Sequence, residues 1–123
     1  MDDIISKSQL LEAYRNGQRH FEFIELSTEE DFSNVVLSGA VFRRCWMEVL
    51  FVSSDLSNCQ FIECCLKTAD FRYANLTKAV VTGCTIESTR FQHAVVDGFV
   101  FSHNSAYGQD SGQEDFDNWI HCT

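Results

Sequence analysis

Histidine and cysteine are the side chains of this sequence best suited to nucleophilic, acid–base or metal chemistry. Histidines stand at positions 20, 93, 103 and 121, and cysteines at positions 45, 59, 64, 65, 84 and 122. A cysteine nucleophile needs a neighbouring base, and a zinc site needs ligands at short spacings such as C-x2-C. Cys64 and Cys65 are adjacent instead, and no histidine lies at ligand spacing beside them. We therefore expect no metal site.

Motifs of other enzyme classes are absent from the sequence as well. It contains neither a glycine-rich phosphate-binding loop nor an H-E-x-x-H zinc motif. We therefore expect a protein that is not an enzyme, with no catalytic residue and no cofactor.

A five-residue repeat runs through residues 19–103 and organises the chain. Neither a helix nor a strand has this period, and self-similarity at a fixed period indicates a solenoid. One column of the repeat holds large apolar residues: Leu56, Phe61, Leu66, Phe71, Leu76, Val81, Ile86, Phe91, Val96 and Phe101. The column two residues earlier holds compact ones, with Phe99 as the exception: Ser54, Cys59, Cys64, Ala69, Ala74, Ala79, Cys84, Thr89 and Ala94.

The segments 69–73 (ADFRY) and 74–78 (ANLTK) make the pattern specific. They resemble the pentapeptide-repeat family, whose pattern is a small residue, Asp or Asn, Leu or Phe, a polar residue and then any residue. The resemblance covers residues 19–103 and implies an all-β solenoid, a right-handed quadrilateral β-helix of about four coils. In that fold four pentapeptides form one square coil, with the central and the small residue pointing inward.

A square coil requires like residues to stack at intervals of about twenty along each of four faces. The sequence meets this requirement if two register shifts are allowed. One is an extra residue between Leu26 and Phe32, and the other is a missing residue between Met47 and Phe51. We interpret both shifts as bulge-like distortions of a corner. The predicted faces are face 1 (Phe32, Phe51, Phe71, Phe91), face 2 (Leu37, Leu56, Leu76, Val96), face 3 (Phe21, Phe42, Phe61, Val81, Phe101) and face 4 (Leu26, Met47, Leu66, Ile86).

Four of the cysteines fall in the compact inward column, where cysteine acts as a small apolar filler. Cys45, Cys64 and Cys84 would stack on one face, about 4.8 Å apart. That spacing permits a disulfide, but a cytosolic setting disfavours one, so we expect Cys45, Cys59, Cys64 and Cys84 to be core residues. Cys65 and Cys122 lie outside the column and have no evident base nearby.

Both ends of the repeat region need covering, because an open solenoid end exposes strand edges and core. Residues 4–17 are expected to form an amphipathic capping helix with Ile4, Ile5, Leu10, Leu11 and Tyr14 on its apolar face, capped by Ser6 or Ser8 and stopped by Gly17. Residues 104–123 form an acidic tail. Phe116, Trp119 and Ile120 either fold back over the last coil or contact a partner or a second copy. Residues 1–123 are expected to form one domain.

The formal net charge of −9 collects at the ends of the chain. Residues 1–29 carry six acids and three bases, residues 30–103 eight and six, and residues 104–123 four and none. A basic face is missing, so direct nucleic-acid binding is not expected. No run of 18 apolar residues predicts a membrane span, and the acidic start lacks a signal-peptide layout, so we expect a cytoplasmic protein.

Apolar residues occupy outward columns where the family pattern expects polar ones. Val41, Val80 and Val100 are predicted to stack on face 3, with Trp46 around the adjoining corner. A contiguous exposed apolar stripe usually marks a protein contact, unless the tail or a second copy covers it. The predicted partner-binding residues are this stripe and the acidic tail: Phe23, Val41, Trp46, Ile62, Val80, Val100, Glu114, Asp115, Asp117 and Trp119.

These features favour a non-enzymatic protein-binding module. The family resemblance leaves three roles open: an immunity protein that neutralises a toxin, a DNA-mimicking modulator of a type II topoisomerase, and an interaction scaffold. A rod of about four coils is only about 20 Å long and its faces are nearly neutral, which suits a DNA mimic poorly. We therefore favour an immunity protein whose partner is a toxin or effector. Since many such toxins are basic nucleases, acidic ends would speed their capture. A homodimer remains open.

Overall fold

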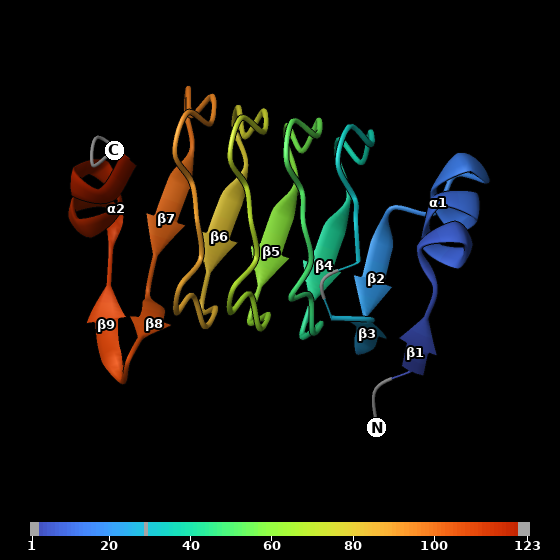
Figure 1. Ribbon diagram of the computed structural model, residues 1–123, viewed down its shortest axis with the longest axis horizontal. Coiled ribbons are helices and arrows are strands. Elements are labelled where there is room, and N and C mark those ends of the chain that lie inside the picture. The colour runs from blue at the N-terminus through green and yellow to red at the C-terminus, as the bar shows by residue number, and fades with distance from the viewer. Residues whose placement is uncertain (1–2, 29, 121–123) are drawn as a thin grey trace.

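A five-stranded parallel sheet forms face 3 of the molecule (Figure 1). The computed structural model describes residues 3–28 and 30–120. The sheet has the order β2-β4-β5-β6-β7. The chain passes along this face five times, so the solenoid has about five turns where the sequence indicates about four, because the first and last partial turns each add a strand. The strands are β2 (His20–Glu22), β4 (Val41–Arg43), β5 (Gln60–Ile62), β6 (Val80–Thr82) and β7 (Val100–Ser102).

The register of this sheet confirms the predicted stacking of face 3. Phe21 pairs with Phe42, and Phe42 with Phe61. Those two steps of 21 and 19 residues are the two register shifts that the sequence requires. The remaining steps join Phe61 to Val81 and Val81 to Phe101.

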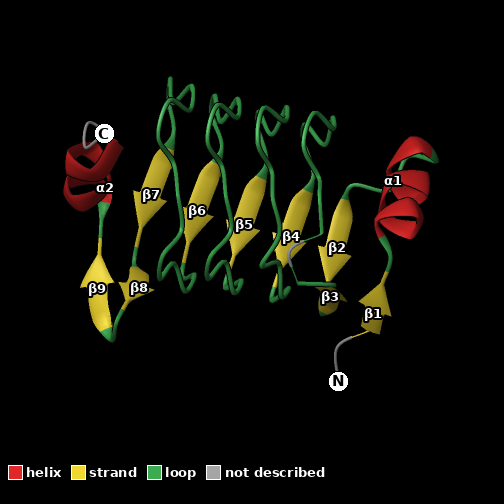
Figure 2. Ribbon diagram, in the orientation of Figure 1, coloured by secondary structure: helices red, strands yellow, loops and turns green. Residues whose placement is uncertain are grey.

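Single parallel bridges join the middle turns on the other three faces, where Figure 2 draws most of the chain as loops. Asp31, Leu50, Asp70 and Arg90 form the bridged column of face 1, and Val36, Asp55, Asn75 and Val95 that of face 2. Glu25, Trp46, Cys65, Thr85 and Ser105 form that of face 4. These bridges place the inward residues of faces 1, 2 and 4 in the predicted stacks.

Stacked phenyl rings fill the core. On face 1 the ring centroids of Phe51 and Phe71 lie 5.2 Å apart, as do those of Phe71 and Phe91. On face 3 the rings of Phe42 stack on those of Phe21 and Phe61, each at 5.3 Å. Offset or parallel ring contacts at these distances add to the free energy gained by burying the rings.

Residues with positive φ recur at the corners of the square coil. At the corner between faces 3 and 4, Phe23, Arg44 and Glu63 have φ values of 55°, 53° and 53°, and Gly83 follows with φ 67°. This left-handed conformation is uncommon for residues other than glycine, asparagine and aspartate. A Cβ on Gly83 would lie 3.2 Å from Cγ of Glu63, so the glycine leaves room for the Glu63 side chain.

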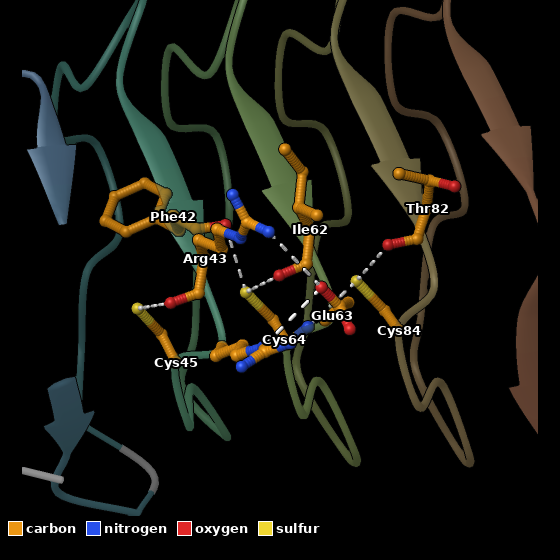
Figure 3. Close-up of polar contacts among 9 residues, drawn as sticks. Phe42, Arg43, Cys45, Ile62, Glu63, Cys64, Thr82 and Cys84 are labelled. Atoms are coloured by element: carbon orange, nitrogen blue, oxygen red, sulfur yellow. Dashed lines mark hydrogen bonds and ion pairs between the residues drawn. The ribbon is translucent and has the colours of Figure 1, made fainter. Parts of the chain in front are cut away.

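The inward cysteines hydrogen-bond to backbone carbonyls of the preceding turn. The thiol of Cys64 donates to the carbonyl of Phe42 at 3.2 Å, and that of Cys84 to Phe61 at 3.2 Å (Figure 3 shows the first). Asn104 ends this column, because its side chain accepts from the Cys84 amide at 2.8 Å and donates to the Val81 carbonyl at 3.0 Å. Cys45, Cys59, Cys64, Cys65 and Cys84 are free thiols.

Burial of the Cys59 thiol makes the free energy of unfolding depend on pH in the alkaline range. Burial raises the pKa of the Cys59 thiol from its ordinary value of 9.0 to about 12. Between these two values the unfolded chain loses the thiol proton while the folded chain keeps it, so unfolding becomes easier as the pH rises.

We expect the free energy of unfolding to fall between pH 9 and 12 more steeply in the parent than in Cys59→Ala. The difference in slope should approach about 1.4 kcal/mol per pH unit, the value for one proton. Urea titrations at a series of pH values measure it. Equal slopes for parent and variant would contradict the raised pKa.

A strand and a helix cover the N-terminal end. Helix α1 (Lys7–Arg15) begins at Ser6, whose hydroxyl accepts from the Gln9 amide while the Gln9 side chain accepts from the Ser6 amide. Strand β1 (Asp3–Ile5) pairs in parallel with β3 (Ile24–Leu26). The expected helix over residues 4–17 is therefore shorter, because Ile4 and Ile5 extend face 4 by one strand instead. Leu10 is the fully buried residue on the inner side of the helix.

The tail folds back as a cap at the opposite end (Figure 1). Strands β8 (Asn104–Ala106) and β9 (Gln109–Ser111) form an antiparallel hairpin, followed by α2 (Gln113–Ile120). The buried ring of Phe116 contacts Phe91, Phe99 and Phe101 at centroid distances of 5.1, 4.7 and 5.2 Å. The Gln113 side chain accepts from the Phe101 amide at 2.9 Å, which satisfies a donor on the open edge of β7. His121 and Cys122 lie outside the described residues.

Candidate partner-binding surface

The outward valines of face 3 do not form a continuous stripe. Register places Gln60 between Val41 and Val80, so the predicted stripe is interrupted in the middle of the sheet. Val80 and Val100 remain neighbours on β6 and β7. The prediction of a stripe along the whole rod is therefore wrong: β5 presents polar Gln60 in this column.

Ile62 lies in the second outward column of face 3. Its register neighbours are Arg43 on β4 and Thr82 on β6. The residue thus stands beside an arginine, close to the corner between faces 3 and 4, and apart from the Val80–Val100 pair. The structure in this way divides the predicted apolar residues of face 3 into two groups.

A mixed group of aromatic, aliphatic and charged residues occupies the corner between faces 3 and 4. The guanidinium carbon of Arg44 lies 5.8 Å from the centre of the Phe23 ring. The carboxylate of Glu63 pairs with Arg43 at 4.0 Å (Figure 3) and with Arg44 at 3.6 Å. We call this group, together with Ile62 and the neighbouring Trp46, the corner cluster: Phe23, Arg43, Arg44, Trp46, Ile62 and Glu63.

Trp46 begins face 4, two residues after Arg44. It bridges to Glu25 in the preceding turn and to Cys65 in the following one, and its indole N–H donates to the carboxylate of Glu48. Its side chain and that of Phe23 are each 43% exposed, which is high for large apolar residues. The backbone bridges fix the position of Trp46 while leaving much of its ring accessible.

The charged members of the corner cluster contribute little to folding. The side chains of Arg43, Arg44 and Glu63 are 51%, 51% and 45% exposed, and ion pairs this exposed typically stabilise a fold by less than about 1 kcal/mol. Tryptophan and arginine are also the residues that most often dominate the binding energy of protein interfaces. The corner cluster is therefore a candidate contact surface.

The predicted residues of the tail lie at the C-terminal end, on α2. The Asp115 carboxylate accepts from the Gly112 amide at 2.9 Å, and that of Asp117 from the Gln113 side chain at 3.1 Å. Glu114 is exposed, and Trp119 is 37% exposed with its ring against Phe101. Strands β6 and β7 separate this group from the corner cluster, so the predicted site residues do not form one continuous patch.

Arg43, Arg44 and Glu63 are missing from the sequence-based prediction. The repeat pattern treats the positions after the central residue as variable, and it gives no reason to pair residues nineteen apart across a corner. The adjacent arginines at 43 and 44 were the available signal, since such a pair is rare in this acidic sequence.

A second group of polar and aromatic side chains lies on face 1 and at the corner that follows it. The His93 and Tyr73 rings stack with centroids 4.9 Å apart. The Arg72 guanidinium pairs with Asp70 at 2.8 Å. Burial pushes the pKa of the Asp70 carboxyl upward, but the hydrogen bonds and charge of Arg72 outweigh it, so this pKa lies below its usual range.

Residues 3–28 and 30–120 contain neither a cluster of metal ligands nor a membrane-spanning helix. In this part of the chain no three His, Cys, Asp or Glu side chains converge as metal ligands would. Neither α1 nor α2, the helices described there, has the length and hydrophobicity needed to cross a membrane.

The family model for pentapeptide repeats matches residues 54–92 and 64–102, with eight copies of the repeat. These residues are the ones that form the regular turns of the solenoid. This chain belongs to the pentapeptide-repeat family. Curated protein sequences gave no match to this pentapeptide-repeat protein.

Two cyanobacterial pentapeptide-repeat proteins of known structure have a similar fold. One is Rfr23 from Cyanothece 51142, at 19% identity and a TM-score of 0.61 over 67% of this chain and 56% of the other. The second is HetL from Nostoc sp. strain PCC 7120, a protein involved in heterocyst differentiation regulation, at 16% identity and a TM-score of 0.65 over 75% of this chain and 43% of the other. The present chain thus matches only about half the length of these structures, and the likeness concerns the fold.

Proposed function

We propose that this pentapeptide-repeat protein is a non-enzymatic protein-binding module that holds its partner at the corner cluster. The observation that carries the proposal is the pair of exposed aromatic rings, Phe23 and Trp46, beside two arginines on the solenoid backbone. Ladder bonds fix this backbone from both neighbouring turns. A preorganised surface loses little conformational entropy on binding.

We further propose that the partner is a toxin or effector and that the protein acts as its immunity protein. The support is the distribution of charge. Asp110, Glu114, Asp115 and Asp117 gather in the C-terminal cap, and residues 104–123 contain no lysine or arginine. An acidic end of this kind accelerates association with a basic partner such as a nuclease.

The alternative, a DNA-mimicking modulator of a type II topoisomerase, has weaker support. A DNA mimic needs acidic side chains at regular intervals along the rod. The bridged column of face 1 instead reads Asp31, Leu50, Asp70 and Arg90, so its charges alternate with an apolar residue and end in a base. In addition, Arg72 pairs with Asp70 and offsets its charge.

A growth-rescue experiment tests the immunity proposal. The protein bound by the tagged parent in extracts of the source cells is identified and produced alone in a host. We expect that product to arrest growth, and we expect coproduction of the pentapeptide-repeat protein to restore it. Trp46→Ala should fail to restore growth at equal abundance, while Tyr73→Ala, altered at the diagonally opposite corner, should restore it.

The outcomes separate the candidate roles. A partner that does not impair growth would favour a scaffold instead of an immunity protein. Inhibition or protection of a purified type II topoisomerase in a supercoiling assay would favour the DNA-mimic role. Rescue by Trp46→Ala as complete as that by the parent would remove the corner cluster from the binding surface.

A further inference from the structure

A hollow of about 610 Å³ lies between the hairpin β8–β9, helix α2 and the last corner of face 4. Two aromatic residues, Tyr107 and Trp119, and two acids, Asp110 and Asp115, contribute to its lining. The volume falls in the range of pockets that bind small molecules, so it has room for one side chain of a partner. Of these residues only Asp115 and Trp119 belong to the partner-binding set predicted from the sequence.

Both aromatic rings are held from one side and accessible from the hollow. Tyr107 is 72% exposed, and its hydroxyl hydrogen-bonds with the Ser88 hydroxyl at 3.0 Å, which ties the hairpin turn to the preceding coil. Trp119 is 37% exposed and packs edge-to-face on Phe101 with a centroid distance of 5.9 Å. Such rings offer electron-rich faces to a cation.

The hollow is negatively charged, and its described lining residues include no lysine, arginine or histidine that would neutralise this charge. Asp115 is fixed in place because its carboxylate accepts from the Gly112 amide at 2.9 Å. Asp110 stands on β9, exposed and opposite Ser105. The other lining residues, all within the described part of the chain, are uncharged: Ile86, Ser88, Thr89, Ala106, Gln109 and Ser111.

We propose that this hollow receives an arginine side chain of the protein partner, an inference that rests on the proposed function. A guanidinium group is planar, so it stacks on aromatic faces and donates two parallel hydrogen bonds to a carboxylate. Tyr107 and Trp119 supply the faces, and Asp110 and Asp115 the carboxylates. The charge complementarity of the acidic cap with a basic partner selects this occupant over an acidic or apolar one.

A titration with isolated side-chain analogues tests the hollow without the partner. Trp46→Phe leaves Trp119 as the single tryptophan, and its fluorescence is followed while N-acetyl-arginine amide is added. The matched probe is N-acetyl-citrulline amide, which has the same shape and no charge. We expect a saturable change with the arginine probe and none with the citrulline probe at equal concentration.

Variants locate the binding. Asp110→Asn should weaken binding of the arginine probe by about tenfold, the effect of about 1.4 kcal/mol. Asp97→Asn removes an exposed acid from face 2, outside the hollow, and should leave that binding unchanged. Equal responses to both probes, no response to the arginine probe, or equal losses in the two variants would each overturn the proposal.

The partner complex distinguishes failure of this inference from failure of the proposed function. If the partner binds the parent and Asp110→Asn with equal affinity, the hollow does not hold its arginine, although the protein-binding function stands. A weaker complex with Asp110→Asn, and not with Asp97→Asn, supports the inference. If the arginine probe binds but no protein partner of the parent exists, the proposed function fails, and with it the assignment of the arginine to a partner.

Discussion

Replacing Phe71 with alanine is expected to lower the free energy of unfolding by about 3–5 kcal/mol. The side chain is fully buried in the middle of the solenoid. Its ring stacks on Phe51 and Phe91 with centroids 5.2 Å away on either side, and it meets Phe61 edge-to-face at 5.7 Å. Alanine would remove these contacts and leave a cavity that the neighbouring turns, tied by the bridges of Asp70 to Leu50 and Arg90, cannot close.

Urea unfolding at constant temperature measures this loss, and Tyr73→Ala is the matched control. Tyr73 is an aromatic residue of the same turn, two positions later, but it points outward and is 57% exposed. Its replacement should change the free energy of unfolding by no more than about 0.5–1 kcal/mol, the range for a surface residue with one ring contact. Similar losses for the two variants would show that the inward stack of face 1 is not what stabilises the solenoid.

Replacing Trp46 with alanine is expected to weaken partner binding by about 30-fold or more, since truncating a central tryptophan of an interface typically costs about 2 kcal/mol or more. The fold should tolerate the change, because the ring is 43% exposed and its indole N–H bonds to Glu48, only two residues away. Isothermal titration of the purified partner measures the affinity, and the unfolding midpoint measures the stability of the same sample.

Two other outcomes would change the account of Trp46. An affinity equal to that of the parent would place the contact on another face of the solenoid. A large fall of the unfolding midpoint would mean that Trp46 stabilises the coil, in which case Arg44→Ala, altered at an exposed ion pair of the same cluster, separates binding from folding. The Tyr73→Ala protein serves as the binding control, because its corner lies between faces 1 and 2.

The solenoid could be predicted from the sequence because its inward positions are under a strong and repetitive constraint. Every turn must stack a residue of similar size on the turn before it, so Phe51, Phe71 and Phe91 recur at steps of twenty. The same constraint revealed the two register shifts, since only compensating steps of 21 and 19 residues keep Phe21, Phe42 and Phe61 in one stack.

The ends of the solenoid were less predictable. Ile4 and Ile5 fit the apolar face of a helix as well as a strand, and their choice depends on the free edge of β3, which lies about twenty residues away in the sequence. The tail left open whether its aromatic residues cover the core or contact a partner. The structure divides them, because Phe116 is fully buried while Trp119 remains 37% exposed.

The charged members of the corner cluster, Arg43, Arg44 and Glu63, escaped prediction for a physical reason. The corner between faces 3 and 4 has a left-handed backbone at residues of different types, so Arg44 and Glu63 carry no signal of the glycine or asparagine kind. Their side chains meet only because the corners of successive turns are superposed. The interruption of the valine column by Gln60, in contrast, follows from the predicted stack, because the stacking of Phe61 between Phe42 and Val81 already puts Gln60 between Val41 and Val80.

Hydroxyl-radical footprinting of the complex tests the central claim most directly, because it reports the solvent exposure of individual aromatic side chains. Phe23 and Trp46 are each 43% exposed in the free protein and Tyr73 is 57% exposed, so all three should be oxidised without the partner. If the partner binds at the corner cluster, we expect it to slow oxidation of Phe23 and Trp46 severalfold and to leave the oxidation of Tyr73 unchanged. Protection of Tyr73, with Phe23 and Trp46 oxidised as fast as in the free protein, would contradict it.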